Sequence, residues 1–387
     1  MAIPLSYNIR NLIVRKTTTL MTGAGIALTV AVLLAVLGLV SGLQSAFEAS
    51  GDPLHVLVMR KGGNAELTSL LTQEQFQIVK NFNGIASKNG QPMASLEVVT
   101  VINLPSIENP DGSNVTLRGL SQRGVAMRKM TIIAGRRFNE GQREIMVGKS
   151  IAKRYPAAQL GKQLRFGRGL WNVVGVMDGQ GSSIDSEIFA DGPQVAADYN
   201  RPDTYSSALL QATDEVTAAA LQKALENDRR LNVTVLSEKD YYTAQTAVSA
   251  APIKFLGFFV CIVMAVGSCF AAMNTMYAAV ARRAKEVGTL RILGFTQGSI
   301  LLSFFLESIL LSLLGGLIAC IVVIPLNTIT TGVGNFATFS ETSFNIHIGP
   351  EVMIIGVLFS LILGAVGGLL PARQAAKKEI LTSLREV

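Results

Sequence analysis

The sequence predicts an α-helical membrane protein with four transmembrane helices and a large α+β extracytoplasmic domain. Three observations lead to this fold class. The 387 residues are 49% hydrophobic and only 16% charged, with a mean hydropathy of +0.39, which is more apolar than a water-soluble globule. Four long stretches are nearly free of charge. A more polar segment, residues 48–250, separates the first stretch from the other three, so the helices are arranged 1+3.

Each apolar stretch is long enough to cross a bilayer, because about 20 helical residues span the hydrocarbon core. The four predicted transmembrane helices cover residues 17–47, 253–281, 298–328 and 351–372. The uncharged run of the first helix is about twice as long as the core of a secretory signal peptide. We therefore expect this helix to be retained in the membrane.

The third predicted helix contains one acid, Glu307. A carboxylate inside a membrane is energetically costly, so such a residue is a functional candidate. We expect Glu307 either to take a polar partner from another helix or to stay protonated. A role in helix packing and a role in transport are both compatible with its position.

Lysine and arginine residues next to the membrane helices predict their orientation. They cluster in residues 1–16, in the connector 282–294 and in the tail 373–387, whereas the loop 329–350 has none. Both termini and the connector are therefore expected to be cytoplasmic, with residues 48–250 in the periplasm. This places the protein in the cell inner (cytoplasmic) membrane. The net charge of +7 then indicates contact with anionic membrane lipids and not with nucleic acid.

The first 16 residues carry apolar side chains at helical spacing, namely Leu5, Ile9, Leu12 and Ile13. This pattern predicts a short amphipathic helix that lies in the cytoplasmic headgroup layer. The alternative is a disordered basic segment that leads into the first membrane helix.

The outer domain alternates strand-like and helix-like segments, which predicts an α+β fold. The predicted strands cover 54–60, 96–103, 163–166, 171–176, 207–212 and 232–236, a strand that runs into a helix covers 144–155, and the predicted helices cover 72–82 and 213–227. Thr72 is a plausible N-cap for the first of these helices. Composition divides the domain into two lobes, with residues 126–204 inserted as the second lobe. Pro252 is expected to mark the start of the second membrane helix.

Several segments resemble catalytic or ligand sites without meeting their requirements. Gly148-Lys149-Ser150 resembles the end of a phosphate-binding loop, but Arg143 stands where that loop needs a glycine. His55 and His347 lie in different segments, without cysteines or carboxylates at ligand spacing. We therefore predict that the chain is not an enzyme and that it holds no metal and no cofactor of its own.

The connector between the second and third membrane helices has a helical apolar stripe. Ala284, Val287, Leu290 and Leu293 recur at every third residue. A helix this short is unstable by itself, so we expect it to dock on something. It is either a turn at the membrane surface or a rigid knob that fits a groove on a cytoplasmic partner.

The polar residues of the connector support both interpretations. Glu286 has the spacing to pair with Arg282 or Arg283 on the same helix. These charged residues are expected to lie mostly off the apolar stripe. Gly288 and Gly294 would allow close approach of another segment or a sharp exit from the helix.

The connector and its neighbours also carry a family resemblance. Residues 272–316 read AMNTMYAAVARRAKEVGTLRILGFTQGSILLSFFLESILLSLLGG and resemble the signature of MacB/FtsX-type ABC transporter permeases. The matching parts are Asn274–Met276, Arg283–Gly288, Leu293-Gly294 and Phe305–Glu307. An Arg-Ile step stands before Leu293 where the family usually has alanine. Further similar stretches lie at residues 8–10, 134–138, 160–162, 173–176 and 370–385.

The resemblance implies an ABC transporter permease subunit that works with a separate cytoplasmic ABC ATPase, which would bind ATP and Mg²⁺. It also implies a dimer with a second permease copy or a paralogue. By this resemblance the connector is the coupling helix that seats in the ATPase, and its site residues are Arg282, Arg283, Glu286, Val287, Gly288, Leu290, Leu293 and Gly294.

ATP-driven closure of the ATPase would move the periplasmic domain and drive export or efflux by mechanotransmission. Two alternatives share this architecture: a permease of a lipoprotein-releasing complex, and an FtsX-like regulator of envelope enzymes without transport. The resemblance leaves open the substrate, the choice between homodimer and heterodimer, and the use of a periplasmic adaptor and outer-membrane channel.

Overall fold

The computed structural model describes residues 4, 7, 10, 13, 14, 16–107, 109–201, 203–335 and 338–377. Most of the predicted N-terminal helix and the tail beyond residue 377 lie outside these described residues. The chain divides into two compact units. The helical unit comprises Met1–Ser41, Ile253–Ile329 and Ile346–Val387, and the head comprises Gly42–Pro252 and Thr330–Asn345.

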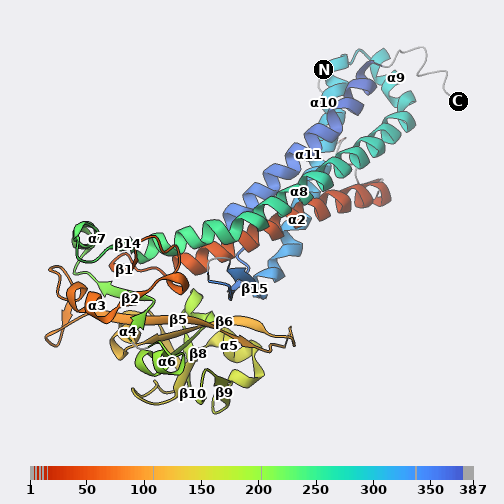
Figure 1. Cartoon of the computed structure of the whole chain (residues 1–387). Helices are drawn as coiled ribbons and strands as arrows, with labels where there is room; N and C mark the ends of the chain where they lie inside the picture. The colour runs from red at the N-terminus through yellow and green to blue at the C-terminus, as the bar shows by residue number, and fades with distance from the viewer. Residues whose placement is uncertain are drawn as a thin grey trace. The chain divides into compact units, whose positions relative to one another are not determined.

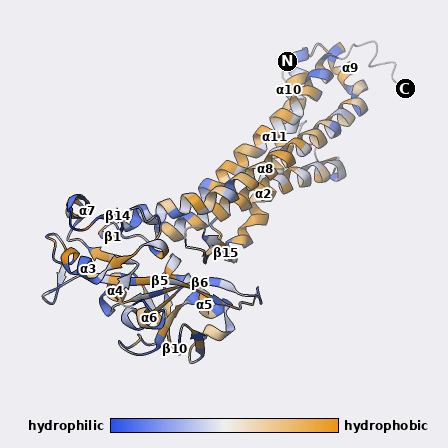
Figure 2. Cartoon of the chain, viewed as in Figure 1, coloured by the Kyte–Doolittle hydropathy of each residue, from blue (hydrophilic) through white to orange (hydrophobic). Residues whose placement is uncertain are grey.

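Four long helices are the main feature of the chain outside its sheet. They are α2 (Lys16–Glu48), α8 (Glu238–Arg282), α10 (Gln297–Val323) and α11 (Pro350–Lys377). Each is long and apolar enough to cross a membrane. Figure 1 shows them side by side, and Figure 2 shows mostly hydrophobic residues along them. The prediction of four long apolar helices is confirmed.

The second long helix begins before the segment that is predicted to cross the membrane. α8 runs without a break from Glu238 through Pro252, and Pro252 is the last residue of the head before the helical unit resumes at Ile253. A proline inside a helix removes one backbone hydrogen bond and usually weakens the helix there. The turns before Pro252 are held by buried side chains of the head, including Tyr241, Tyr242 and Ala250. This packing keeps the first part of α8 helical.

In the helical unit, α10 and α11 approach closely because small residues face each other. A Cβ added at Gly316 would lie 2.8 Å from the Cβ of Ser360, and one at Gly368 would collide with Ser308. The Ser308 hydroxyl donates to the Gly364 carbonyl at 2.7 Å. The motif Gly364-x-x-x-Gly368 therefore serves a contact within one chain.

The head is built on one ten-stranded mixed sheet with the order β14-β1-β13-β5-β6-β11-β8-β10-β7, in which β9 pairs with β10. Its strands are β1 (His55–Arg60), β5 (Ala94–Leu104), β6 (Ser113–Leu120), β7 (Thr131–Gly135), β8 (Glu144–Gly148), β9 (Gln163–Phe166), β10 (Gly169–Asp178), β11 (Glu187–Asp191), β13 (Ser207–Gln211) and β14 (Val233–Ser237). Two neighbouring pairs, β6 with β11 and β8 with β10, are parallel. The sheet is continuous through both predicted lobes, whose boundaries remain a prediction.

Short elements complete the head. They are β2 (Leu71–Thr72), β3 (Ser87–Lys88), β4 (Gln91–Pro92), β12 (Thr204–Tyr205), α3 (Gln73–Val79), α4 (Gln122–Met127), α5 (Lys149–Arg154), α6 (Gly192–Asp198), α7 (Glu215–Asn227), η1 (Glu66–Thr68), η2 (Pro156–Ala158) and η3 (Ser183–Ser186). Thr72 is the N-cap of α3, and it forms a capping box with Gln75. The predicted strands and helices of the outer domain are confirmed, with ends shifted by a few residues. β6, β7 and β11 were not expected.

Separate hydrophobic clusters stabilise the two ends of the sheet. One lies between α7 and strands β1, β13 and β14, and includes Leu210, Leu221 and Val235. Another surrounds Trp171, whose ring stacks on Phe166 with centroids 5.0 Å apart. Full burial of a large apolar side chain contributes about 1.5–3 kcal/mol. The two clusters therefore anchor opposite ends of one sheet.

The segment predicted as the loop 329–350 contains a hairpin. After the short helix η4 (Ile324–Thr328), β15 (Thr330–Asn335) pairs antiparallel with β16 (Ser340–Asn345). The hairpin belongs to the head, although it connects α10 and α11 along the chain.

Candidate functional site

The predicted coupling helix is present in the helical unit as α9 (Ala284–Ile292). It ends in a turn that requires glycine. Gly294 has a φ of +91°, and the amides of Gly294 and Phe295 donate to the carbonyls of Arg291 and Leu290, each at 3.1 Å. This is a Schellman motif, which satisfies the last carbonyls of the helix. The expected sharp exit at Gly294 is therefore observed.

The buried face of α9 follows the predicted stripe for two turns. Ala284, Val287 and Gly288 are buried, and Val287 packs in a cluster with side chains of α8, α10 and α11. Leu290 is only half-buried, and Leu293 is 64% exposed. Leu293 follows the last residue of α9, Ile292, so the part of the stripe that is buried within this chain ends before it.

Arg283 lies at the corner between α8 and α9 and is only 3% exposed. Its Nη1 donates to Glu307 Oε2 at 2.7 Å, and its Nε donates to Glu286 Oε2 at 3.1 Å. Arg283 is therefore buried although it is not part of the apolar stripe. It is buried because a carboxylate of α10 compensates its charge.

Aromatic rings complete the environment of Arg283. Its guanidinium carbon lies 4.9 Å from the ring centre of Phe304 and 5.3 Å from that of Tyr7, distances typical of cation–π contacts. The Tyr7 hydroxyl also donates to Glu286 Oε2 at 3.0 Å. One guanidinium therefore joins the N-terminal segment, α9 and α10.

Glu307 is 5% exposed and has Arg283 as its partner. The sequence left two possibilities for Glu307, a polar partner or protonation. The structure contains the polar partner. A bare carboxylate here would be costly, and the charge-assisted hydrogen bond offsets that cost.

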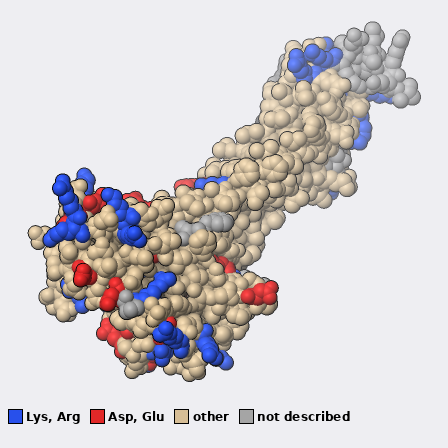
Figure 3. All heavy atoms as spheres, viewed as in Figure 1, with Lys and Arg blue, Asp and Glu red and all other residues tan. Residues whose placement is uncertain are grey.

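The outward side of α9 combines apolar and charged side chains. Arg282, Lys285 and Glu286 are exposed, and Ile292 is 61% exposed at the end of the helix. Figure 3 shows basic side chains gathered at the end of the helical unit where Figure 1 labels α9. Both expectations for the connector, a turn at the membrane surface and a docking helix, agree with this surface.

The head contains a second buried charge cluster, which the sequence analysis missed. Arg118 on β6 makes five hydrogen bonds to Glu66, Glu97 and Glu187, at 2.8–3.4 Å. Arg128 donates to both oxygens of Glu97, at 2.7 and 2.6 Å. Burial by itself raises the pKa of Glu97, but Arg128 and Arg118 lower it below its ordinary value. Charged residues in the middle of apolar strand segments are the sequence signal for this cluster.

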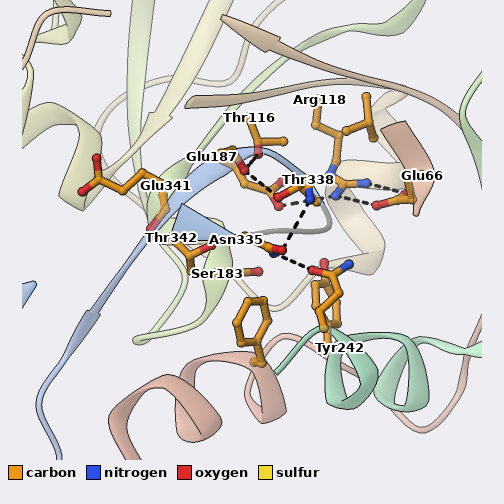
Figure 4. A pocket seen from close by; sticks show the side chains of 15 residues that line it. Glu66, Thr116, Arg118, Ser183, Glu187, Tyr242, Asn335, Thr338, Glu341 and Thr342 are labelled. Atoms are coloured by element: carbon orange, nitrogen blue, oxygen red, sulfur yellow. Dashed lines mark hydrogen bonds and ion pairs between the residues drawn. The ribbon is translucent and has the colours of Figure 1, made fainter. Parts of the chain in front are cut away.

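A polar cavity lies beside Arg118 (Figure 4). Its volume is about 20 Å³, which suits a single water molecule and not a substrate. In Figure 4, Arg118 points toward Glu66 and Glu187, while Tyr242 and Asn335 line the other side. The cavity is therefore a structural feature and not a cargo site.

The motifs that the sequence analysis set aside have structural partners. Lys149 of the Gly-Lys-Ser triplet pairs with Asp178 at 2.6 Å and with Asp185 at 3.3 Å. Buried His55 contacts Glu238 at 2.7 Å through its Nδ1. Within the described residues, no group of three His, Cys, Asp or Glu side chains is arranged to hold a metal ion.

Two family descriptions match the chain. Residues 19–228 match the MacB-like periplasmic core domain, and residues 257–380 match the FtsX-like permease C-terminal domain. The second match contains α9, Arg283 and Glu307, so the candidate site lies in the permease portion.

Curated relatives agree with these matches. The chain is 24% identical to the uncharacterized ABC transporter permease YknZ of Bacillus subtilis (strain 168), covering 97% of this chain and 96% of YknZ. It is also 24% identical to the macrolide export ATP-binding/permease protein MacB of Bdellovibrio bacteriovorus, covering 98% of this chain. The chain spans 61% of the length of that MacB.

Among solved structures, the extracellular domain of a noncanonic ABC-type transporter YknZ from Gram-positive bacteria is 16% identical, with a TM-score of 0.36. It covers 47% of this chain and 99% of that domain. The family assignment depends on the sequence matches, the first of which covers more than half of the chain. With its four apolar helices and its MacB-like domain, the chain belongs to the MacB/FtsX-type ABC transporter permeases, a family whose members work with a cytoplasmic ATPase.

Proposed function

We propose that this permease couples ATP hydrolysis by a separate cytoplasmic ATPase to movement of its head, and so drives export by mechanotransmission. The observation that carries the proposal is the two-sided character of α9. Its inner side is fixed to the helical unit by Arg283 and Val287, and its outer side presents Ile292 and Leu293 among charged residues. Because Arg283 bonds to Glu307, a force that a bound partner exerts on α9 is transmitted to α10.

The proposed assembly is a dimer, with a second copy or a paralogue as the other permease and with ATP and Mg²⁺ held by the ATPase. Both termini and α9 then face the cytoplasm, and the head faces the periplasm. Membrane lipids cover the apolar helices. A periplasmic adaptor and an outer-membrane channel would complete an export path. The name of the MacB relatives supports export in particular.

The double variant Ile292→Asp/Leu293→Asp tests the docking of the ATPase. The tagged permease is purified from native membranes, and the co-purifying ABC ATPase is identified by mass spectrometry. We expect the variant to lose this ATPase and its ATP turnover in nanodiscs, because two carboxylates replace the exposed apolar contact. Leu170→Asp/Val216→Asp, at positions 54% and 82% exposed in the head, is the matched control.

If Ile292→Asp/Leu293→Asp keeps full ATPase binding and ATP turnover, the proposed docking site is wrong. Depletion of the permease in cells then separates the related functions. Retention of an exported substrate supports export, whereas accumulation of lipoproteins in the inner membrane supports lipoprotein release. A defect in envelope enzymes without any retained cargo supports the FtsX-like role.

A further inference from the structure

The hairpin β15–β16 is attached to the head by polar contacts. An isolated two-stranded hairpin is marginally stable at best, so these contacts matter for its order. Arg154, at the end of α5, forms an ion pair with Glu341 of β16, and its Nη1 donates to Ser343 Oγ at 2.6 Å. Arg154 is 8% exposed, and the Glu341 side chain is 17% exposed. The pair is therefore largely withdrawn from water, and removal of one partner would leave the other charge buried and uncompensated.

Hydroxyl groups add to this ion pair. Thr116 on β6 donates to Ser340 Oγ at 2.7 Å, and the Ser343 amide donates to Ser186 Oγ at 2.7 Å. Just before β16, the Phe339 carbonyl accepts a hydrogen bond from Asn114 Nδ2 at 2.9 Å. Three head elements, β6, η3 and α5, thus bind one hairpin. Each of these contacts lies within the head.

The position of the hairpin in the chain gives these contacts a consequence. α10 follows α9 in the helical unit and leads through η4 into β15, and β16 leads through residues 346–349 into α11. We propose that the Arg154–Glu341 joint anchors the α10–α11 connection on the head and makes this connection a transmission arm. Arg154 and Glu341 are positioning residues in this proposal, which rests on the proposed function for its role in the transport cycle.

Hydrogen exchange on the permease alone tests the anchor without any partner. In Arg154→Gln and Glu341→Gln, backbone amides of residues 340–345 should exchange about tenfold faster or more, because the hairpin opens without its joint. Arg143→Gln is the matched control, since Arg143 pairs with Asp198 at 2.8 Å in the same head but not with the hairpin. Unchanged exchange in both joint variants would overturn the anchor.

A disulfide tests transmission in the complex with the ATPase. The three native cysteines lie in α8 and α10, so cysteines placed in the head form a separate pair. Thr116→Cys/Ser340→Cys replaces two hydroxyl groups that are 2.7 Å apart, which suits a disulfide between β6 and the hairpin. The readout is the difference in amide exchange of the head between the vanadate-trapped ATP state and the nucleotide-free state.

We expect Arg154→Gln to lose this ATP-dependent difference while hydrolysis continues. The oxidised Thr116→Cys/Ser340→Cys pair should restore the difference in the Arg154→Gln background, and reduction should abolish it again. Ser95→Cys/Ser121→Cys, at a hydroxyl pair 3.2 Å apart elsewhere in the head, should not restore it.

Two results would overturn the transmission arm. One is a normal ATP-dependent difference in Arg154→Gln. The other is a block by the oxidised disulfide in the otherwise native protein, because the joint would then have to open during the cycle. If the native complex shows no ATP-dependent difference at all, the proposed function fails, whereas the exchange of the permease alone still decides the anchor.

Discussion

Arg118 in the head and Arg283 in the helical unit are both 3% exposed, and both bind carboxylates from distant segments. Their surroundings differ. The partners of Arg118, which are Glu66, Glu97 and Glu187, are themselves buried. Arg283 binds one buried acid, Glu307, and one acid with a 56% exposed side chain, Glu286.

This difference separates a cluster that only holds a fold from one that can respond to a partner. A fully buried and satisfied network resists change, because any loss leaves a desolvated charge. The network of Arg283 has one end in solvent on α9, where the proposed ATPase partner would reach Glu286. The other end, Glu307, lies inside a membrane-spanning helix. A contact at the surface is thus linked to α10 through a single side chain.

The largest effect is expected from Arg118→Met. This change leaves three buried carboxylates without their shared guanidinium, which should destabilise the head by on the order of 5 kcal/mol. Trp171 is the single tryptophan of the chain and lies buried in the head, so its fluorescence reports unfolding of the head in nanodisc-embedded protein. Arg165→Met, at an exposed strand position, is the control and should change stability by less than about 0.5 kcal/mol. Equal stability of both variants would show that Arg118 does not organise the head.

The next largest effect is expected from Arg283→Gln, which leaves Glu307 buried without a cation. Breaking such a pair typically costs about 3–5 kcal/mol. Here we expect the loss to appear as weaker local stability of α9 and α10. Amide exchange of α9 should rise, while the Trp171 signal should stay unchanged.

Glu307→Gln should destabilise the helical unit less than Glu307→Leu, since the amide oxygen still accepts from Arg283. Glu351→Gln, at an exposed acid of α11, is the control, and equal effects of Gln and Leu at Glu307 would contradict the hydrogen-bonded acid.

Local patterns were sufficient to predict the long helices, α9 and its exit, and a helix cap in the head. Apolar length predicted the four long helices, and the three-residue spacing predicted α9 with its buried Val287. Thr72 could be predicted as an N-cap because its hydroxyl bonds to a backbone amide only three residues away, so the signal is local in the sequence. Gly294 was predicted as an exit for a similar local reason.

Contacts between distant segments could not be predicted in the same way. Arg283 and Glu307 are 24 positions apart, and Arg154 and Glu341 are 187 apart, so no periodicity relates them. The hairpin β15–β16 was missed because Thr, Gly and Ser dominate its strands and make it resemble a loop. Its order depends on partners supplied by the head. A carboxylate within an otherwise apolar segment, such as Glu97 or Glu307, is a sequence signal that points to such a contact without naming the partner.

Acid should weaken the head through Glu97. The pKa of Glu97 is lowered because Arg128 and Arg118 outweigh the effect of burial. Since its folded-state pKa is depressed, Glu97 contributes stability at neutral pH, and this contribution is lost as the pH falls below its ordinary value of 4.5. The stability of the head, followed by Trp171 fluorescence at several pH values, should therefore fall in acid. This fall should be smaller in Glu97→Gln than in the unchanged protein. An identical acid response in the two proteins would contradict this assignment.

The smallest effect on stability, and an informative one for function, is expected at Glu286. Its ion pair with Arg283 is largely exposed on the carboxylate side, so Glu286→Gln should change stability by less than about 1 kcal/mol. Glu286→Lys places a cation beside Arg283 on the surface where we propose that the ATPase docks. The complex should still hydrolyse ATP, but the ATP-dependent change in head amide exchange should disappear. Lys285→Gln, at the neighbouring exposed position, should retain that change. A full response of the head in Glu286→Lys would remove Glu286 from the coupling path and leave Arg283 as a structural residue, which is the role that Arg118 has in the head.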